Sequence, residues 1–498
     1  MALMGLDLGT TGVKCTITDN MGQIISAAYQ EYETLTPADG EYELDPEIVW
    51  QSTKKVISES NSFVRESILA VSVSSFGEAF VMVDKAGKPL MNTLLQTDSR
   101  GTDELDELIN HISTEKIREK TGLNPAVTFA VPKIMWIKRN RPDVYRRTHL
   151  ILLYGSYILY RLGGVSAIDY TLAARSLAFN VSNNEWDKDI LEAANIDEKL
   201  LPTPHRLGTV VGDIDPNLAQ ELGLNTDIKL VTGAHDQICV AIGSGAINEG
   251  DCTNGMGSVD NLSPIFKDTS NLTLNAKNNY PTIPYLNDTY TTVSYVYDGG
   301  TSLKWFRDTF GNEEVNAANM AGVSVYNIFD KTIPKEPTKL LVLPHFSGAA
   351  VPYFDEASRG MILGISGLTK KPDIYRALME GVAFEQRINM ENMATGGIKI
   401  KRLLATGGGS RSDVWLQIKA DVLNTRVERV HMKESGTLGV IIMAGVAIGL
   451  FDSFESAMSE LTTTDKYFEP IPENVAYYSK QFKKYLELYN FNKKLREI

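Results

Sequence analysis

The pattern of apolar and polar positions predicts a strand, a tight turn and a second strand at the start of the chain. Residues 4–8 and 13–18 form apolar or β-branched runs of the kind that make strands. Between them, Gly9 and Gly12 allow backbone conformations that a Cβ would forbid. We therefore expect a glycine hairpin here.

Further elements follow in the first third of the chain. Strand-like runs at 23–29, 68–75 and 80–84 indicate that a mixed sheet begins the protein. A helix is predicted from Pro46, because Asp45 suits the N-cap and proline suits the first helical position. Helical periodicity then covers the segments 102–120, 132–139 and 154–162.

The later part of the chain places glycine turns after strands. An apolar run at 230–233 ends near Asp236, and residues 251–258 predict a second glycine hairpin. The run 402–405 leads into three glycines, 407–409, and then into a helical segment. A strand, glycine turn and helix N-terminus let backbone approach a nucleotide closely. These patterns indicate duplicated α/β domains that face a nucleotide in a cleft.

Composition narrows the classes of partner. A chain of 498 residues is too long for one core and fits two or three domains. The formal net charge of −13 argues against non-specific binding to nucleic acid or to an anionic membrane. No apolar run reaches the roughly 18 residues that span a bilayer. We expect neither a nucleic-acid partner nor a membrane partner.

The cysteines indicate a reducing compartment. Cys15, Cys239 and Cys252 are odd in number and lack the spacing of a zinc site or a disulfide framework. The first residues show no signal-peptide pattern. We therefore expect a cytoplasmic location.

The first hairpin carries residues suited to phosphate chemistry. Its turn can aim backbone N–H groups and the Thr10 and Thr11 hydroxyls at a phosphate. Asp7 at the strand end could hold a cation, and Lys14 adds a positive charge. An ordinary glycine hairpin is the competing interpretation.

Several motifs together resemble one family. Residues 7–11 look like a first phosphate loop, and 405–421 are close to an adenosine-loop pattern. Residues 360–365 with 373–380 resemble a C-terminal signature, and 133–136 resemble part of a second one. Over nearly its whole length the chain resembles the FGGY carbohydrate kinases of the actin, hexokinase and sugar-kinase superfamily.

The resemblance implies a fold and its ligands. It implies an α/β fold of two ribonuclease H-like, actin-like ATPase domains with mixed central sheets and a cleft between them. Residues 1–245 would bind the sugar and residues 246–498 the nucleotide, closing about a hinge near 243–250. ATP and Mg²⁺ are the implied cofactors, a sugar the implied substrate, and a homodimer an implied assembly.

The resemblance also assigns roles to single residues. Asp236 would be the general base that takes the proton of the attacking hydroxyl, although a helix N-cap is its competing role. Asp7 and Asp236 would bind the metal ion, and His235 would line or brace the site. The predicted ATP contacts are Thr10, Thr11, Lys14, Gly257, Ser258, Gly407, Gly408 and Gly409.

Substrate choice depends on residues 74–80, which occupy the place of the sugar-reading loop. Glu78 stands where xylulokinases and gluconokinases typically have a Met-His pair, and its carboxylate can accept hydrogen bonds from adjacent hydroxyls. A solvated loop charge is its competing interpretation. The predicted sugar contacts are Phe76, Gly77, Glu78, Asp98 and Asp236.

These residues favour a kinase for a ketose, such as a xylulose-like pentulose, or for a polyol. Glu78 would repel a sugar acid such as gluconate unless it were protonated or paired. A gluconate kinase and a non-catalytic sugar or ATP sensor are the alternatives. An actin-like ATPase would need no sugar loop, and an NAD enzyme lacks its dinucleotide fingerprint.

Overall fold

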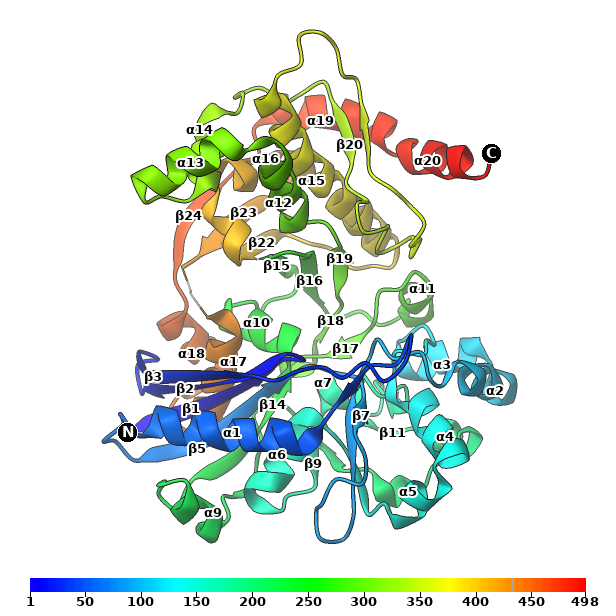
Figure 1. The fold of residues 1–498 in the computed structure, drawn as a ribbon, viewed down its shortest axis with the longest axis vertical. Helices are drawn as coiled ribbons and strands as arrows, with labels where there is room; N and C mark the ends of the chain where they lie inside the picture. The colour runs from blue at the N-terminus through cyan, green and yellow to red at the C-terminus, as the bar shows by residue number, and fades with distance from the viewer. Residues whose placement is uncertain (432–433) are drawn as a thin grey trace.

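The protein has two α/β parts stacked along its longest axis (Figure 1). The computed structural model describes residues 1–431 and 434–498. One part is built on a six-stranded sheet and the other on an eight-stranded sheet. Most of the N-terminal half forms the lower part in Figure 1, and most of the C-terminal half the upper part. The mixed α/β architecture agrees with the sequence prediction.

The first sheet contains the predicted N-terminal hairpin. β1 pairs antiparallel with β2 and parallel with β5, and Leu8 lies opposite Val13 next to the turn. The predicted hairpin is therefore confirmed. In sheet order the strands are β13 (Val210–Asp213), β14 (Lys229–His235), β5 (Ile68–Ser75), β1 (Ala2–Leu8), β2 (Gly12–Asp19) and β3 (Ile24–Glu31).

Alternation along β1 sends its side chains to two different helix layers. Leu6 shares a core with residues of α1 (Pro46–Asn61), whereas Leu3 shares one with Ile441 of α17 (Ser435–Ala447). The predicted start of α1 is confirmed, because the Asp45 carboxylate accepts a hydrogen bond from the Glu47 amide at 2.8 Å. Asp7 has the parity of Leu3, so it faces the α17 side of the sheet.

The second sheet repeats the layout of the first. β15 pairs antiparallel with β16 and parallel with β22, which pairs parallel with β23. This is the arrangement of β1, β2, β5 and β14, so the predicted duplication is observed. The strands are β17 (Ile283–Pro284), β18 (Tyr290–Thr291), β16 (Asp260–Phe266), β15 (Asp251–Met256), β22 (Arg402–Thr406), β23 (Arg426–Val430), β24 (Thr464–Phe468) and β19 (Ser294–Val296).

Helices α17 and α18 (Phe454–Leu461) belong to the C-terminal half of the chain but lie in the lower part (Figure 1). α17 packs against α10 (Asp236–Gly243) and against β1, β5 and β14. The division into residues 1–245 and 246–498 stays a prediction, and these two helices cross it in space.

One predicted helix is wrong in its extent. The segment 102–120 forms two helices, α2 (Thr102–Ile112) and α3 (Thr114–Thr121), because Ser113 between them has a φ of 64°. The other helices of this half are α4 (Ala130–Asn140), α5 (Pro142–Arg147), α6 (Tyr154–Gly163), α7 (Tyr170–Ala173), α8 (Lys188–Ala193) and α9 (Pro216–Glu221).

The remaining elements complete the two parts. The other helices are α11 (Leu272–Lys277), α12 (Gly300–Phe310), α13 (Asn312–Ala321), α14 (Val325–Thr332), α15 (Lys371–Thr395), α16 (Asp413–Leu423), α19 (Pro472–Tyr485) and α20 (Leu488–Arg496). Short paired strands include β6 (Phe80–Val83) with β8 (Leu150–Leu153), and β20 (Leu341–Leu343) with β21 (Met361–Leu363). Within the described residues, no helix is both long and apolar enough to cross a bilayer.

Candidate functional site

Hydrogen bonds from the backbone and from Tyr32 fix the turn of the first hairpin. The Gly9 amide donates to the Gly12 carbonyl at 2.9 Å. The Tyr32 hydroxyl donates to the Gly9 carbonyl at 2.5 Å and lies 3.0 Å from that of Gly12. Thr11 is exposed and Thr10 half-buried. The hairpin therefore presents both threonines on a fixed backbone, as a phosphate-binding turn requires.

Asp7 lies at the end of β1 among other acidic groups. Its Oδ1 accepts a hydrogen bond from the Ser74 hydroxyl at 2.7 Å. Burial raises the pKa of Asp7, and the nearby negative charges of Asp236 and Glu434 raise it further. Lys14, opposite Asp7 in the hairpin register, forms an ion pair with Glu434 at 2.6 Å. Asp7 therefore lies buried beside other negative charges, which disfavour its ionised form.

Asp236 is the first residue of α10, directly after β14. The N-cap is His235, whose Nδ1 accepts from the Gln237 amide at 3.3 Å. Asp236 is therefore not the helix N-cap, which was its competing role. The Asp236 side chain remains 40% exposed, with its Oδ1 3.0 Å from His235 Nδ1. A half-exposed carboxylate at this position is accessible to a substrate hydroxyl, and its role as a base stays a prediction.

His235 lies between the predicted sugar loop and Asp236. A Cβ at Gly77 would lie 2.8 Å from His235 Cδ2 and 3.2 Å from Arg175 Cγ. Because only glycine fits between these side chains, the loop can approach both of them closely. The loop, Arg175 and the start of α10 therefore meet at one place.

Glu78 is not a solvated loop charge. It is 7% exposed and has a φ of 66°, in the left-handed region. Arg175 Nε donates to Glu78 Oε1 at 2.6 Å, and a second guanidinium nitrogen also contacts this oxygen. The guanidinium lies 5.1 Å from the centre of the Phe129 ring. The sequence interpretation missed Arg175, which follows Glu78 by 97 residues.

Asp98 is fully buried and already accepts several hydrogen bonds from within the protein. Its carboxylate accepts from the Tyr42 amide at 2.8 Å and from Arg100 Nε at 2.9 Å. Burial alone would raise the pKa of Asp98, but the hydrogen bonds from Arg100 and Tyr42 lower it. Phe76 is buried against Tyr154, with ring centres 4.7 Å apart. Direct sugar contact by Asp98 and Phe76 therefore stays a prediction.

Lys133, in the second family-like motif, lies close to these charges. It is fully buried in α4 and its Nζ donates to the Val127 carbonyl at 2.5 Å. Burial lowers the pKa of Lys133 to about 8, although the charges of Asp98 and Glu78 act in the opposite direction. Lys133 therefore adds a buried basic group whose pKa responds to the charges of Asp98 and Glu78.

The C-terminal half contains a cavity of about 560 Å³ between the second hairpin and the glycine turn. Four of the predicted ATP contacts line it: Gly257, Ser258, Gly408 and Gly409. Gly407 has another role, since a Cβ there would lie 2.9 Å from the Met256 carbonyl. Helices α12 and α14 supply lining residues that the glycine motifs did not indicate: Thr301, Lys304, Tyr326, Asn327 and Asp330.

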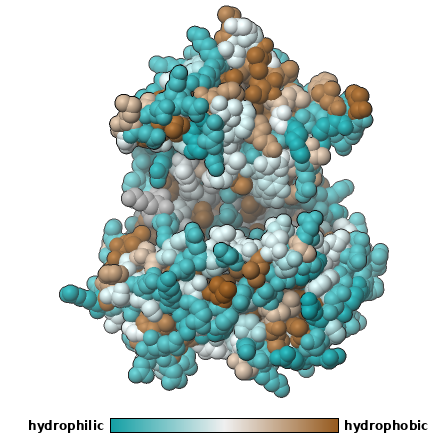
Figure 2. Space-filling model, viewed as in Figure 1, coloured by the Kyte–Doolittle hydropathy of each residue, from teal (hydrophilic) through white to brown (hydrophobic). Residues whose placement is uncertain are grey.

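A hydrogen bond and the electrostatics of one tyrosine connect this half to the predicted sugar site. Asn261 of β16 donates to Gln237 Oε1 at 3.2 Å, next to Asp236. Burial raises the pKa of Tyr295 in β19, and the charges of Arg175 and Glu78 also act on its hydroxyl. The surface is hollowed between the two parts (Figure 2). Residues from both parts therefore surround the candidate site.

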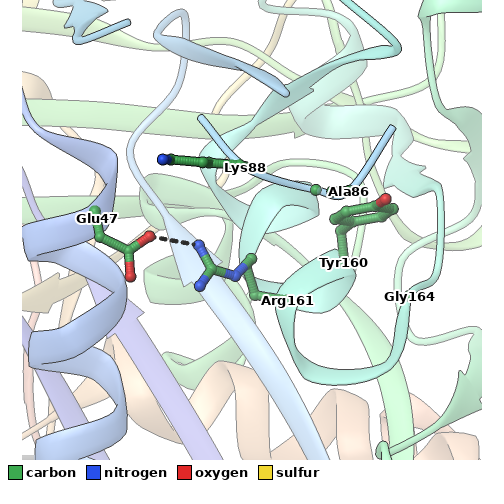
Figure 3. Close-up of a pocket in the computed structure, with 7 residues that line it drawn as sticks. Glu47, Ala86, Lys88, Tyr160, Arg161 and Gly164 are labelled. Carbon is green, nitrogen blue, oxygen red and sulfur yellow. Dashed lines mark hydrogen bonds and ion pairs between the residues drawn. The ribbon is translucent and has the colours of Figure 1, made fainter. Parts of the chain in front are cut away.

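A separate open pocket of about 360 Å³ lies beside α1 and α6 (Figure 3). Arg161 points across it to Glu47, with NH1 2.9 Å from Oε2. Lys88 and Tyr160 also line it. None of the predicted site residues lines this pocket, so we assign no part of the reaction to it.

Comparison with known proteins decides the family. Residues 2–243 match the N-terminal domain of the FGGY family of carbohydrate kinases, and residues 269–448 match its C-terminal domain. The chain belongs to the FGGY family of carbohydrate kinases. FGGY kinases are phosphotransferases with an alcohol group as acceptor, so this chain is an enzyme of that class with a sugar substrate and ATP as the implied phosphate donor.

Individual relatives extend over the same length. The chain is 29% identical to a xylulose kinase of Staphylococcus epidermidis, over 99% of this chain and 97% of the relative. It is 28% identical to glycerol kinase 2 of Sulfolobus acidocaldarius, over 94% and 93%. The ligand-bound xylulose kinase of Lactobacillus acidophilus superposes with a TM-score of 0.87 at 25% identity, covering 98% of each chain. The predicted FGGY membership and actin-like fold are confirmed.

Replacing Asp7 by Asn should raise the Tm at neutral pH, measured by differential scanning calorimetry. Because the pKa of Asp7 is raised in the folded state, the fold favours the protonated carboxyl, and this contribution is lost as the pH rises through that pKa. Each kcal/mol gained should raise the Tm by about 1–2 °C in a chain of this size. The gain should shrink as the pH falls toward the raised pKa. The exposed Asp39→Asn is the control, and an equal gain there would contradict the prediction.

Replacing Arg175 by Met should raise the KM for the sugar about tenfold or more and leave the KM for ATP within about twofold. The reason is that Glu78 would lose the guanidinium that fixes it and would remain buried. Steady-state kinetics with each substrate varied in turn would measure this. Arg175→Lys keeps the positive charge but loses the forked guanidinium. Its KM for the sugar should therefore lie between that of the wild type and that of Arg175→Met. An equal rise in both KM values would contradict the assignment.

Proposed function

We propose that this FGGY kinase phosphorylates a terminal hydroxyl of a pentulose or a related ketose or polyol, with Asp236 as the general base. The observation that carries the proposal is the position of His235. Its imidazole lies against Gly77 of the sugar loop on one side and within 3.0 Å of Asp236 on the other. A hydroxyl held by Glu78 would therefore lie near the Asp236 carboxylate.

The chain's own residues supply what phosphoryl transfer needs. The reaction requires an aligned hydroxyl, a base near it and charge neutralisation on the phosphates. Asp236 would accept the hydroxyl proton at its carboxylate. Thr10, Thr11 and Lys14 would meet the phosphates from one half, and Ser258 from the other. Closure of the halves about a hinge near 243–250 would exclude water, which would otherwise take the phosphoryl group.

The residues present fit Mg²⁺. Among the described residues no group of three or more His, Cys, Asp or Glu side chains forms a dedicated metal cage. Mg²⁺ keeps several waters and binds through one or two carboxylates together with substrate phosphates. Asp7 and Asp236 are such a pair: burial raises the pKa of Asp7, and the nearby charge of Asp236 raises it further. Bound there, the ion would neutralise charge on the transferring phosphates.

The pairing of Glu78 with Arg175 bears on the substrate class. An unpaired Glu78 would repel a sugar acid, but the Arg175 guanidinium compensates the charge of Glu78. A sugar-acid kinase, such as a gluconate kinase, is therefore the second candidate. The relatives named xylulose kinase support the ketose. The carboxylates Asp7 and Asp236 argue against the non-catalytic sensor.

A coupled assay of ADP release over ketoses, polyols and sugar acids would test the substrate. We expect the highest kcat/KM on D-xylulose or a related ketose, with glycerol and xylitol as polyol arms and gluconate as the acid arm. Strong turnover on gluconate alone would replace the ketose by the second candidate. If no compound caused ADP release, the protein would instead be the non-catalytic sugar or ATP sensor.

Asp236→Asn should reduce kcat by about 10²–10⁴-fold and leave both KM values within about threefold, because the amide cannot take the proton. The same coupled assay, with the preferred sugar, would measure it. His235→Gln is the comparison, since a bracing residue should lower kcat far less. Unchanged turnover in Asp236→Asn would show that another group is the base.

A further inference from the structure

A buried ion pair lies beneath the second hairpin. Lys419 of α16 and Asp260 of β16 are both fully buried. Lys419 Nζ lies 2.8 Å from each oxygen of the Asp260 carboxylate and 2.8 Å from Asn254 Oδ1. The ammonium group therefore uses all its donors within the protein.

The Asp260 carboxylate is held from further elements. Asn254 Nδ2 donates to its Oδ1 at 2.8 Å. Gln386 Nε2, from α15, donates to the same oxygen at 2.8 Å and to the Asp260 carbonyl at 2.9 Å. Residues on β15, α15 and α16 thus converge on one carboxylate in β16. Such a network fixes Asp260 both at its side chain and at its backbone.

The pair connects the second hairpin to α16, and residues of both of these elements line the 560 Å³ cavity. Asp260 is opposite Met256 in the register, so these two residues flank the turn that carries Gly257 and Ser258. Lys419 lies one helical turn after Trp415, which lines the cavity beside the glycine turn. Taking two charges out of water is expensive, and an apolar pair of similar volume is often no less stable. Stability alone therefore does not account for this pair.

We propose that Lys419 and Asp260 are positioning residues that set the second hairpin for the phosphates of ATP. The proposal rests on the proposed function for the identity of the nucleotide. The pair holds the turn at Gly257 and Ser258 at a fixed distance from the glycine turn. Without it, the hairpin shifts relative to α16, and phosphate contacts are lost.

The test is MgATP binding without sugar, measured by isothermal titration calorimetry. Lys419→Met should weaken binding about tenfold or more, because Asp260 is left charged and unpaired and the hairpin moves. The double variant Lys419→Met with Asp260→Leu removes both charges. Its Tm should return toward the wild-type value, while its MgATP binding should stay at least about tenfold weaker.

A matched control separates positioning from general destabilisation. Arg376 and Glu380 form another buried ion pair in the same half, with Arg376 Nε 2.8 Å from Glu380 Oε1. Arg376→Met should lower the Tm and leave MgATP binding within about twofold. Equal weakening in Arg376→Met, or recovery of wild-type affinity in the double variant, would overturn the proposal.

The outcome is independent of sugar turnover. A wild type that binds MgATP but phosphorylates no sugar would contradict the proposed function and leave this inference open to the same measurements. A wild type that binds no MgATP would overturn both.

Discussion

The arrangement of the site depends on the close approach of α10 and α17. A Cβ at Gly439 would lie 2.0 Å from the Cys239 carbonyl, and one at Gly243 would lie 1.9 Å from the Ser435 carbonyl. Any side chain at either position would push the two helices apart. α10 begins with Asp236, and a Cβ at Gly436 near the start of α17 would lie 3.9 Å from Asp7 Oδ2. The helix contact therefore sets the separation of the two carboxylates.

The same contact ties the two parts of the protein together. α17 comes from the C-terminal half of the chain, yet it covers the face of the first sheet to which Asp7 points. The chain must therefore pass from one part to the other more than once. These chain connections would limit how one part can move relative to the other. The second hairpin also contacts α10 directly, through Asn261 and Gln237.

Local patterns in the sequence predicted the helices and strands well. They could not predict contacts between residues far apart in the sequence. The hairpin at Gly9 and the cap at Asp45 were predictable, because neighbouring residues determine them. Periodicity continues through Ser113, so the break caused by its positive φ could not be seen. Trp415 and Lys419 share one helix face, which is the available signal for a buried lysine. Its partner Asp260 is 159 residues away, and no local pattern names it.

The electrostatics divides the charged residues of the site into two groups. Glu78 with Arg175, Asp98 with Arg100, and Asp260 with Lys419 are paired within the protein, so they hold geometry before any substrate arrives. Asp7 is different, because burial and the acidic groups near it raise its pKa. Its ionised form is costly until a cation is present. A magnesium ion carried with ATP phosphates would remove that cost, so nucleotide binding would be coupled to ionisation of Asp7.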